Sequence, residues 1–136
     1  MSQATLYTSW SRWHERLHKT LLSKPNLIPK GACILLSISG GQDSMALLQL
    51  IFDLQRIHNW KINVWHGNHG WHEKSNEIAF ELEEWCKIKN IPFFCDTNKK
   101  HFKNSEAQAR EWRYDCLRLI ASKISFNQTK CPCNHI

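Results

Sequence analysis

The sequence is poor in residues that interrupt folded structure. It has five glycines and four prolines in 136 residues, which excludes collagen-like and proline-rich low-complexity chains. It has no run of about 18 apolar residues, so we expect neither a membrane-spanning helix nor a membrane partner. The first residues lack the basic, apolar and small-residue pattern of a secretory signal. Together these absences favour a globular protein that stays inside the cell.

The composition is that of an ordinary folded domain with a basic excess. Hydrophobic residues make up 42% of the chain and charged residues 22%. A chain of 136 residues corresponds to one domain and buries about two thirds of its unfolded surface. The net charge of +6 and the pI of about 9.1 suit a polyanionic partner such as RNA or a nucleotide. They suit equally a basic protein with no such partner.

The six cysteines fall into two groups. Cys33, Cys86 and Cys116 occupy apolar positions of periodic segments, where reduced cysteines behave as small buried hydrophobes. With no secretory signal, this favours a reducing compartment. Cys131 and Cys133, near His135, resemble part of a zinc site, but such a site needs four ligands and only this tail offers candidates. We expect no zinc site, and the role of these two cysteines stays open.

Hydrophobic periodicity predicts alternating helices and strands. Short apolar runs predict strands at Cys33–Ile38, Lys61–His66 and Ile91–Cys95. Helical spacing of apolar residues predicts helices over 8–23, from about 43 to 57, over 75–89, and from 104 or 105 to about 123. This order predicts an α/β fold with a doubly wound parallel sheet. A fourth strand then has to come from residues 124–136, an otherwise poorly specified tail.

Most of the seven tryptophans lie on predicted helix faces. In the first helix, one face carries Trp10, Trp13, Leu17 and Leu21. We therefore expect the tryptophans in the core rather than as stacking platforms for bases.

The clearest chemical signal is the segment 39–44, SGGQDS, between a predicted strand and a predicted helix. Gly40 and Gly41 allow a tight turn with positive φ and a close approach to a ligand. Free backbone N–H groups and the positive end of the helix dipole make such a loop an anion site. The Ser39 and Ser44 hydroxyls add donors. The loop lies at the carboxyl end of its strand, where open α/β sheets bind ligands. A tight turn without a ligand is the plain alternative.

This loop matches neither of two common phosphate-binding motifs. No lysine follows the glycines, so it is not a Walker A loop, and the Gly-x-Gly-x-x-Gly spacing is also missing. Asp43 is then informative, because a carboxylate repels a triphosphate unless a metal ion bridges them. We expect Asp43 to be either a Mg²⁺ ligand or the N-terminal cap of the helix.

Three segments give the chain a family resemblance. Segment 39–44 after a hydrophobic strand resembles the PP-loop of the N-type ATP pyrophosphatases. Segment 66–71, HGNHGW, resembles the His-x-Asp-His segment of one branch, the tRNA(Ile)-lysidine synthetases of cyanobacteria and plastids. Segment 105–114, SEAQAREWRY, resembles that branch's Ser-Glu-Ala-x-Ala-Arg-x-Trp-Arg-Tyr helix. The resemblance extends over about residues 10–136 and implies a Rossmann-like layer.

The resemblance implies a tRNA-modifying ligase that forms a C–N bond. ATP adenylates the C2 oxygen of the wobble cytidine in an isoleucine tRNA with a CAU anticodon, and pyrophosphate is released. The amino group of L-lysine then displaces AMP, which leaves lysidine. ATP and Mg²⁺ are the implied cofactors, and a plastid stroma or a bacterial cytoplasm is the implied location. Asp43 is the implied catalytic and Mg²⁺-binding residue, and the implied ATP-binding residues are Ser39, Gly40, Gly41, Gln42, Asp43 and Ser44.

The chain departs from this family in two places. Asn68 stands where the family usually has Asp, which removes a charge and leaves a turn residue. The family's second motif, a Gly-His segment and an Asp-x-x-Glu-Thr helix start, is missing, since Cys133–Ile136 looks like the start of the fourth strand. We therefore expect residues 1–136 to be a partial PP-loop ATP-binding domain, incomplete at the C-terminus, inactive alone and completed by a C-terminal half.

Two rival functions stay open. The first is another PP-loop tRNA-modifying enzyme, although thiolation enzymes with a Cys-x-x-Cys pair are disfavoured because that spacing is missing. The second is a nucleotide-binding fragment without catalysis. The sequence does not predict an oligomeric state.

Four further residues are candidate substrate contacts. His66 and His69 follow the second predicted strand, although a histidine at that place is more often structural. Arg110 and Arg113 share a helix face, where they can meet RNA phosphates or pair with nearby glutamates. For at least one arginine we expect structural pairing with Glu106 or Glu111. A basic loop, with Lys99, Lys100 and Lys103, either contacts RNA or is simply solvated.

Overall fold

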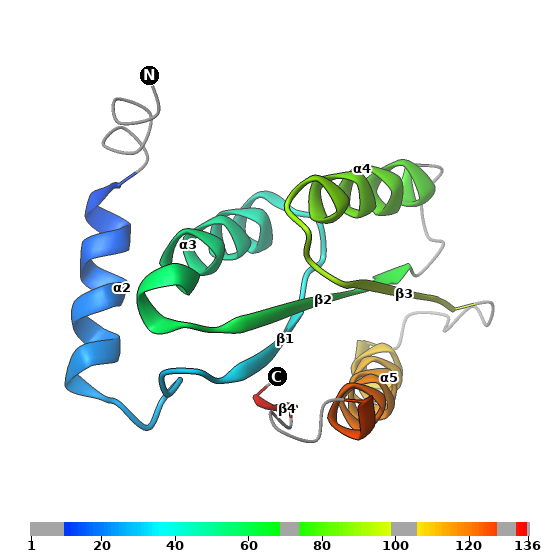
Figure 1. Cartoon of the computed structure of the whole chain (residues 1–136). Coiled ribbons are helices and arrows are strands. Elements are labelled where there is room, and N and C mark those ends of the chain that lie inside the picture. Colours follow the sequence, from blue (N-terminus) through cyan, green and yellow to red (C-terminus); the bar gives the residue numbers. More distant parts are fainter. Residues whose placement is uncertain (1–9, 69–73, 99–105, 128–132, 136) are drawn as a thin grey trace.

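The computed structural model describes residues 10–68, 74–98, 106–127 and 133–135 (Figure 1). Helices and strands alternate along these residues. The strands are β1 (Cys33–Ser37), β2 (Lys61–Asn68), β3 (Phe93–Thr97) and β4 (Cys133–His135). The helices are α2 (Arg12–Ser23), α3 (Gln42–His58), α4 (Ser75–Ile88) and α5 (Glu106–Asn127). Among the described helices, none is both long and apolar enough to cross a lipid bilayer.

The strands form one parallel sheet in the order β3-β2-β1-β4, so the predicted doubly wound α/β fold is confirmed. The chain runs from β1 outward through β2 to β3 and then returns to the other side of β1. Parallel crossovers are right-handed, so this reversal moves α5 to the face opposite α3 and α4 (Figure 1). β4 fills the fourth position, which the sequence assigned to the tail.

Side chains alternate across the sheet and build one core on each face. On β1, Ile34 faces α3 and α4, whereas Cys33 and Leu35 face α5. The first core joins the sheet to α2, α3 and α4, and includes Leu21, Ile34, Ile38, Leu48, Ile51, Leu54, Ile62, Val64, Leu82 and Cys86. The second joins the sheet to α5 and includes Cys33, Leu35, Trp65, Leu117, Ile120, Ala121 and Ile124. Because both faces of the sheet are covered, Cys33–Leu36 of the central strand β1 form an uninterrupted apolar run.

Cys33, Cys86, Cys95 and Cys116 form no disulfide bond, and the prediction of reduced thiols at Cys33, Cys86 and Cys116 is confirmed. Cys33 and Cys86 are buried and Cys116 is half-buried. Burial raises the pKa of Cys86 to about 11, which keeps this thiol protonated and unreactive.

All three predicted strands differ from their predicted bounds. β1 ends at Ser37 rather than Ile38, β2 continues past His66 to Asn68, and β3 covers Phe93–Thr97 rather than Ile91–Cys95. The prediction of Asn68 as a turn residue is therefore wrong. Asn68 pairs with β3 instead, and its Nδ2 donates to Oδ1 of Asn76 at 2.9 Å. Pairing between strands outweighs the low strand propensity of asparagine here.

Helix α2 packs through a face that matches the predicted one only in part: Leu17 and Leu21 face the core as predicted, whereas Trp10 and Trp13 do not. Its inner residues are His14, Leu17, His18 and Leu21, of which His14 and Leu21 are buried. Trp13 is 65% exposed and Trp10 is 38% exposed, so the expectation that both lie in the core is wrong. The periodicity misled because histidine counts as polar, whereas both histidines here face α3.

Two histidine contacts hold α2 against α3. The Ser11 N–H donates to Nδ1 of His14 at 2.9 Å, so the ring proton lies on Nε2. Nε2 then donates to Oδ2 of Asp53 at 2.7 Å. One turn further along α2, Nδ1 of His18 lies 3.0 Å from Nε2 of His58. These contacts set the position of α2 on the domain.

We predict that acid weakens this packing. Burial, followed by repulsion from His18 and Lys30, lowers the pKa of His58 below its ordinary value of 6.5. The unfolded chain therefore takes up this proton more readily than the folded one. The stabilising contribution is complete above pH 6.5 and is lost as the pH falls from 6.5 towards the lowered pKa.

Urea unfolding at about pH 8 and about pH 5 measures this effect. The variant His58→Gln has no ring to titrate, so its unfolding free energy should fall less on acidification than that of the parent chain. An equal fall in both proteins would contradict the assignment to His58.

Candidate functional site

The loop 39–44 joins the carboxyl end of β1 to the first turn of α3. Gly40 has φ 90°, in the left-handed region, whereas Gly41 is extended with φ −73° and caps α3. The prediction of positive φ is therefore right for Gly40 and wrong for Gly41. A Cβ on Gly40 would collide with Ile78 of α4, but a Cβ on Gly41 would meet nothing nearer than Oγ of Ser39 at 3.6 Å. Only Gly40 is required by the fold itself.

The two serine hydroxyls brace this loop from within. Oγ of Ser44 accepts from the Gly40 N–H at 3.1 Å and donates to the Gly41 carbonyl at 3.1 Å. Oγ of Ser39 accepts from the Gly41 N–H at 3.3 Å and donates to Oγ of Ser44 at 3.0 Å. Both hydroxyl protons are thus used inside the loop. The serines shape the site, and their predicted role as donors to a ligand stays a prediction.

The free donors come from the first turn of α3. No described residue accepts a hydrogen bond from the backbone N–H groups of Gln42, Asp43 and Ser44. The helix has 17 residues, so its dipole adds a partial positive charge at the same end. Three N–H groups and this dipole form a site for an anion such as phosphate.

Asp43 is exposed and stands at the second position of α3. The expectation that it caps the helix is wrong, because the helix begins at Gln42 and Gly41 is the cap. In the first turn its carboxylate instead complements the helix dipole. Its role as a Mg²⁺ ligand stays a prediction. The donors fit that ion, since Mg²⁺ commonly takes one or two carboxylates together with substrate phosphates and water.

No other group of acidic, histidine or cysteine residues competes for that role in the described part of the chain. Within residues 10–68, 74–98, 106–127 and 133–135, no cluster of three such side chains is able to hold a metal ion. A cation at this site would therefore depend on Asp43 and on the phosphates of a bound nucleotide.

His66 lies beneath the loop and is 4% exposed. Its Nδ1 lies 2.8 Å from the carbonyl oxygen of Ile38, so Nδ1 carries the proton and donates. The Ile38 N–H donates in turn to the carbonyl of Trp65 at 2.9 Å. These bonds hold the chain where β1 turns into the loop, which favours the structural role of His66. His69, the lysine loop and Cys131 lie outside the described residues.

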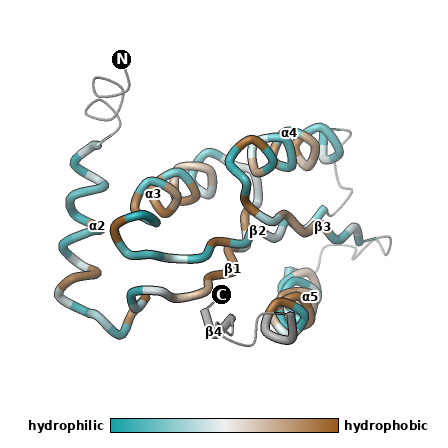
Figure 2. Tube along the Cα trace, in the orientation of Figure 1, coloured by the Kyte–Doolittle hydropathy of each residue, from teal (hydrophilic) through white to brown (hydrophobic). Residues whose placement is uncertain are grey.

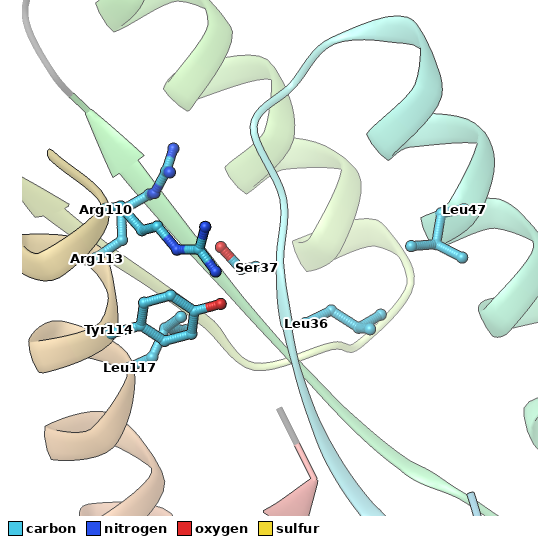
Figure 3. Close-up of a pocket in the computed structure, with 7 residues that line it drawn as sticks. All are labelled: Leu36, Ser37, Leu47, Arg110, Arg113, Tyr114 and Leu117. Carbon is cyan, nitrogen blue, oxygen red and sulfur yellow. The ribbon is translucent and has the colours of Figure 1, made fainter. Parts of the chain in front are cut away.

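A crevice opens beside the loop, along the side of β1 where the sheet order reverses (Figure 3). Its volume is about 420 Å³. The lining comes from the end of β1, from α3 and from α5, namely Leu36, Ser37, Leu47, Arg110, Arg113, Tyr114 and Leu117. Open α/β sheets bind ligands at such reversal points, because two loops diverge there.

Arg110 and Arg113 both face this crevice (Figure 3). Neither forms an ion pair with Glu106 or Glu111, so the predicted structural pairing is wrong. Arg110 instead lies over the ring of Tyr114, with Cζ 5.5 Å from the ring centroid. Two guanidinium groups without a carboxylate partner among the described residues give the crevice a positive wall opposite Leu36 and Leu47 (Figure 3).

Sequence reasoning gave no role to Tyr114 or Ser37. Tyr114 lies four residues after Arg110 on a helix, and that spacing was a usable signal of a shared face. Ser37 had no such signal, because its place in the crevice depends on α5 packing across the sheet.

The comparisons with known proteins match this architecture. The profile of the PP-loop domain family matches residues 11–128. The chain belongs to this family. It is 54% identical, over 93% of its length, to the tRNA(Ile)-lysidine synthase of a Prochlorococcus marinus strain. It is 47% identical over 90% to that of Parasynechococcus marenigrum, and 36% identical over 82% to the "tRNA(Ile)-lysidine synthase, chloroplastic" of Pyropia yezoensis. The chain spans 38%, 36% and 34% of those proteins.

We predict that the two PP-loop glycines differ in their effect on stability. Gly40→Ala should lower the free energy of unfolding by about 1–3 kcal/mol, from the left-handed φ and the collision with Ile78. Gly41→Ala adds the same methyl group in an extended conformation and should change it by less than about 0.5 kcal/mol. Urea denaturation compares the two variants. Equal losses would contradict the geometry of the PP-loop described above.

Proposed function

We propose that residues 1–136 form the ATP-binding part of a PP-loop ATP pyrophosphatase that modifies tRNA. More specifically, we propose the ligation of L-lysine to the wobble cytidine of the CAU-anticodon isoleucine tRNA. The observation that carries the proposal is the PP-loop at the end of a central strand, with the N–H groups of three consecutive residues free. The names of the relatives supply the substrate and the product.

In the first step, the PP-loop holds the phosphates of ATP that leave as pyrophosphate. The C2 oxygen of the cytidine attacks the α-phosphorus, and the bond from that phosphorus to the bridging oxygen breaks. The electron pair passes to pyrophosphate. The N–H groups of Gln42, Asp43 and Ser44 stabilise this growing charge, and donors of this kind contribute about 3 kcal/mol each. Asp43 would hold Mg²⁺, which neutralises phosphate charge when bound.

In the second step, the amino group of lysine attacks C2 and AMP leaves with the former C2 oxygen. The crevice beside the PP-loop suits the anionic part of these substrates. Arg110 and Arg113 there present guanidinium groups, which bind phosphate oxygens in pairs. The phenol of Tyr114 adds a donor at the same wall. We assign substrate contact to these residues on that chemistry.

The names and source organisms of the same relatives suggest where in the cell this protein is located. One carries the word "chloroplastic" in its name, and others come from Prochlorococcus and Synechococcus strains. We propose a plastid stroma or a bacterial cytoplasm for this chain.

We predict that Gly41→Val abolishes ATP binding and leaves the fold intact. An extended φ of −73° accepts a β-branched residue, but the added methyl groups would occupy the space above the free N–H groups. Calorimetric titration of ATP with Mg²⁺ present compares this variant with Thr20→Val on the remote helix α2. Parent-like affinity in Gly41→Val would sink the assignment of the phosphate site.

We predict that Asp43→Asn separates metal-dependent from metal-free binding. The amide keeps the shape of the carboxylate and removes its charge. Affinity for Mg·ATP should fall by about ten-fold, whereas affinity for metal-free ATP should stay or rise, because the carboxylate no longer repels the phosphates. The control is Asp115→Asn on α5, an exposed carboxylate that pairs with Arg118 at 3.0 Å. A Mg²⁺ dependence equal to that of the parent would remove the metal role of Asp43.

Transfer of labelled lysine tests the full reaction. The chain is incubated with the CAU isoleucine tRNA, ATP and Mg²⁺, with and without the C-terminal part of the Prochlorococcus relative. Label in the tRNA supports the lysine ligation. ATP binding without label in either mixture would favour a nucleotide-binding module or a different tRNA modification.

A further inference from the structure

The outer face of α2 carries features that the nucleotide site does not use. Arg12, Arg16 and Lys19 are exposed and recur at helical spacing, on the side away from the buried His14 and Leu21. Figure 2 shows α2 as a largely hydrophilic helix. We call the residues Arg12, Trp13, Arg16 and Lys19 the α2 outer face.

An aromatic ring sits among these cations. Trp13 is 65% exposed, whereas Trp60 and Trp65 are 5% and 1% exposed. The guanidinium carbon of Arg16 lies 5.6 Å from the centroid of the Trp13 ring. This cation–π contact holds the arginine near the ring, and the remaining exposed area is large enough for a second flat group.

The inner contacts of α2 keep this face in a fixed position. His14 bonds to Asp53, and His18 bonds to His58, both on α3. The ring of Trp13 is therefore presented by a helix anchored at two points. A surface fixed in advance loses less entropy when it binds a partner.

The charge on the molecule is distributed unevenly around α3. Helix α3 lies between α2 and α4 (Figure 1). α4 exposes Glu77, Glu81 and Glu83. The acid Glu15 on α2 is already engaged, with the indole N–H of Trp10 at 3.0 Å and with Lys19 at 3.8 Å. α4 also exposes Lys87, with Lys74 before it and Lys89 after it, so a polyanion is drawn towards α2 in preference to α4.

We infer that the α2 outer face is an RNA-binding surface. Arg12, Arg16 and Lys19 pair with phosphates, and an unpaired base stacks on Trp13. This inference rests on the proposed function, which supplies a tRNA as partner. An acidic peptide offers carboxylates to the cations, whereas RNA offers a phosphate and a flat base in every nucleotide. Bases in a duplex are already stacked, so the fitting element is a single-stranded loop of RNA.

Charge reversal tests the phosphate contacts. The double variant Arg12→Glu/Arg16→Glu on α2 is compared with the double variant Lys74→Glu/Lys87→Glu. The second variant changes the net charge by the same amount, but next to the acidic residues of α4. The probe is a fluorescent anticodon stem-loop of the CAU isoleucine tRNA. The α2 double variant should bind the stem-loop about ten-fold more weakly than the parent chain. The slope of log K against log salt should also become shallower, by about 0.7 for each phosphate that the variant no longer binds. The α4 pair should stay within about two-fold of the parent chain.

Removal of the ring tests the stacking. Trp13→Ala should bind the stem-loop about ten-fold more weakly and bind a fully paired duplex as the parent does. Equal weakening for both probes would overturn the base contact. The inference of an RNA-binding surface on α2 would be wrong if the two charge-reversed double variants bound the stem-loop equally well. It would also be wrong if the parent chain did not bind the stem-loop.

A parallel ATP titration separates this inference from the proposed function. All variants should bind Mg·ATP as the parent does, because α2 does not contribute to the PP-loop or the crevice. Loss of RNA binding with ATP binding retained supports the surface. A parent chain that binds the stem-loop through α2 but binds no ATP would refute the proposed nucleotide site and leave the RNA surface standing.

Discussion

The position of β1 between β2 and β4 is the constraint on which the rest of this structure depends. The chain leaves β1 in one direction and later returns to its other edge. That reversal moves α5 to the opposite face of the sheet and brings Arg110 and Arg113 beside the end of β1 (Figure 3). The turn after β1 becomes the PP-loop. One strand therefore sets both the phosphate loop and the positively charged crevice beside it.

The PP-loop depends on backbone groups more than on side chains. Its serine hydroxyls bond to one another and to the glycines, and this leaves N–H groups as the free donors. Gly40 packs against Ile78 and adopts a left-handed φ, while His66 bonds to the carbonyl of Ile38, the residue before the loop. A site built in this way is rigid before a ligand arrives, which favours electrostatic stabilisation of a leaving group.

Helix α2 stands apart from that site in chemistry as well as in place. Its inner face contacts α3 through two histidines and also packs Leu17 and Leu21 into the core. This arrangement makes its attachment sensitive to protons and leaves a tryptophan on the outside. With a tryptophan that faced the core, α2 would only shield one side of the domain from solvent. The exposed ring instead gives the domain a second surface, remote from the nucleotide loop.

Local sequence determined much of this protein. The order of helices and strands, the parallel sheet, the glycine loop after β1 and the burial of Cys33 and Cys86 all follow from patterns that span a few residues. Such patterns are decisive because hydrophobic spacing and turn chemistry act within one element and its neighbours. The segments that resemble the PP-loop family are also local, and the family match confirms them.

Tertiary contacts decided the remainder. Ile78, 38 residues after Gly40, leaves no room for a side chain at that position of the loop. Asp53 and His58 decided which face of α2 turns inward, and pairing with β3 carried Asn68 into the sheet. Arg110, Arg113 and Tyr114 form the wall of a crevice because α5 crosses to the other side of β1. Each of these outcomes depends on residues far apart in the chain, whose meeting no local pattern encodes.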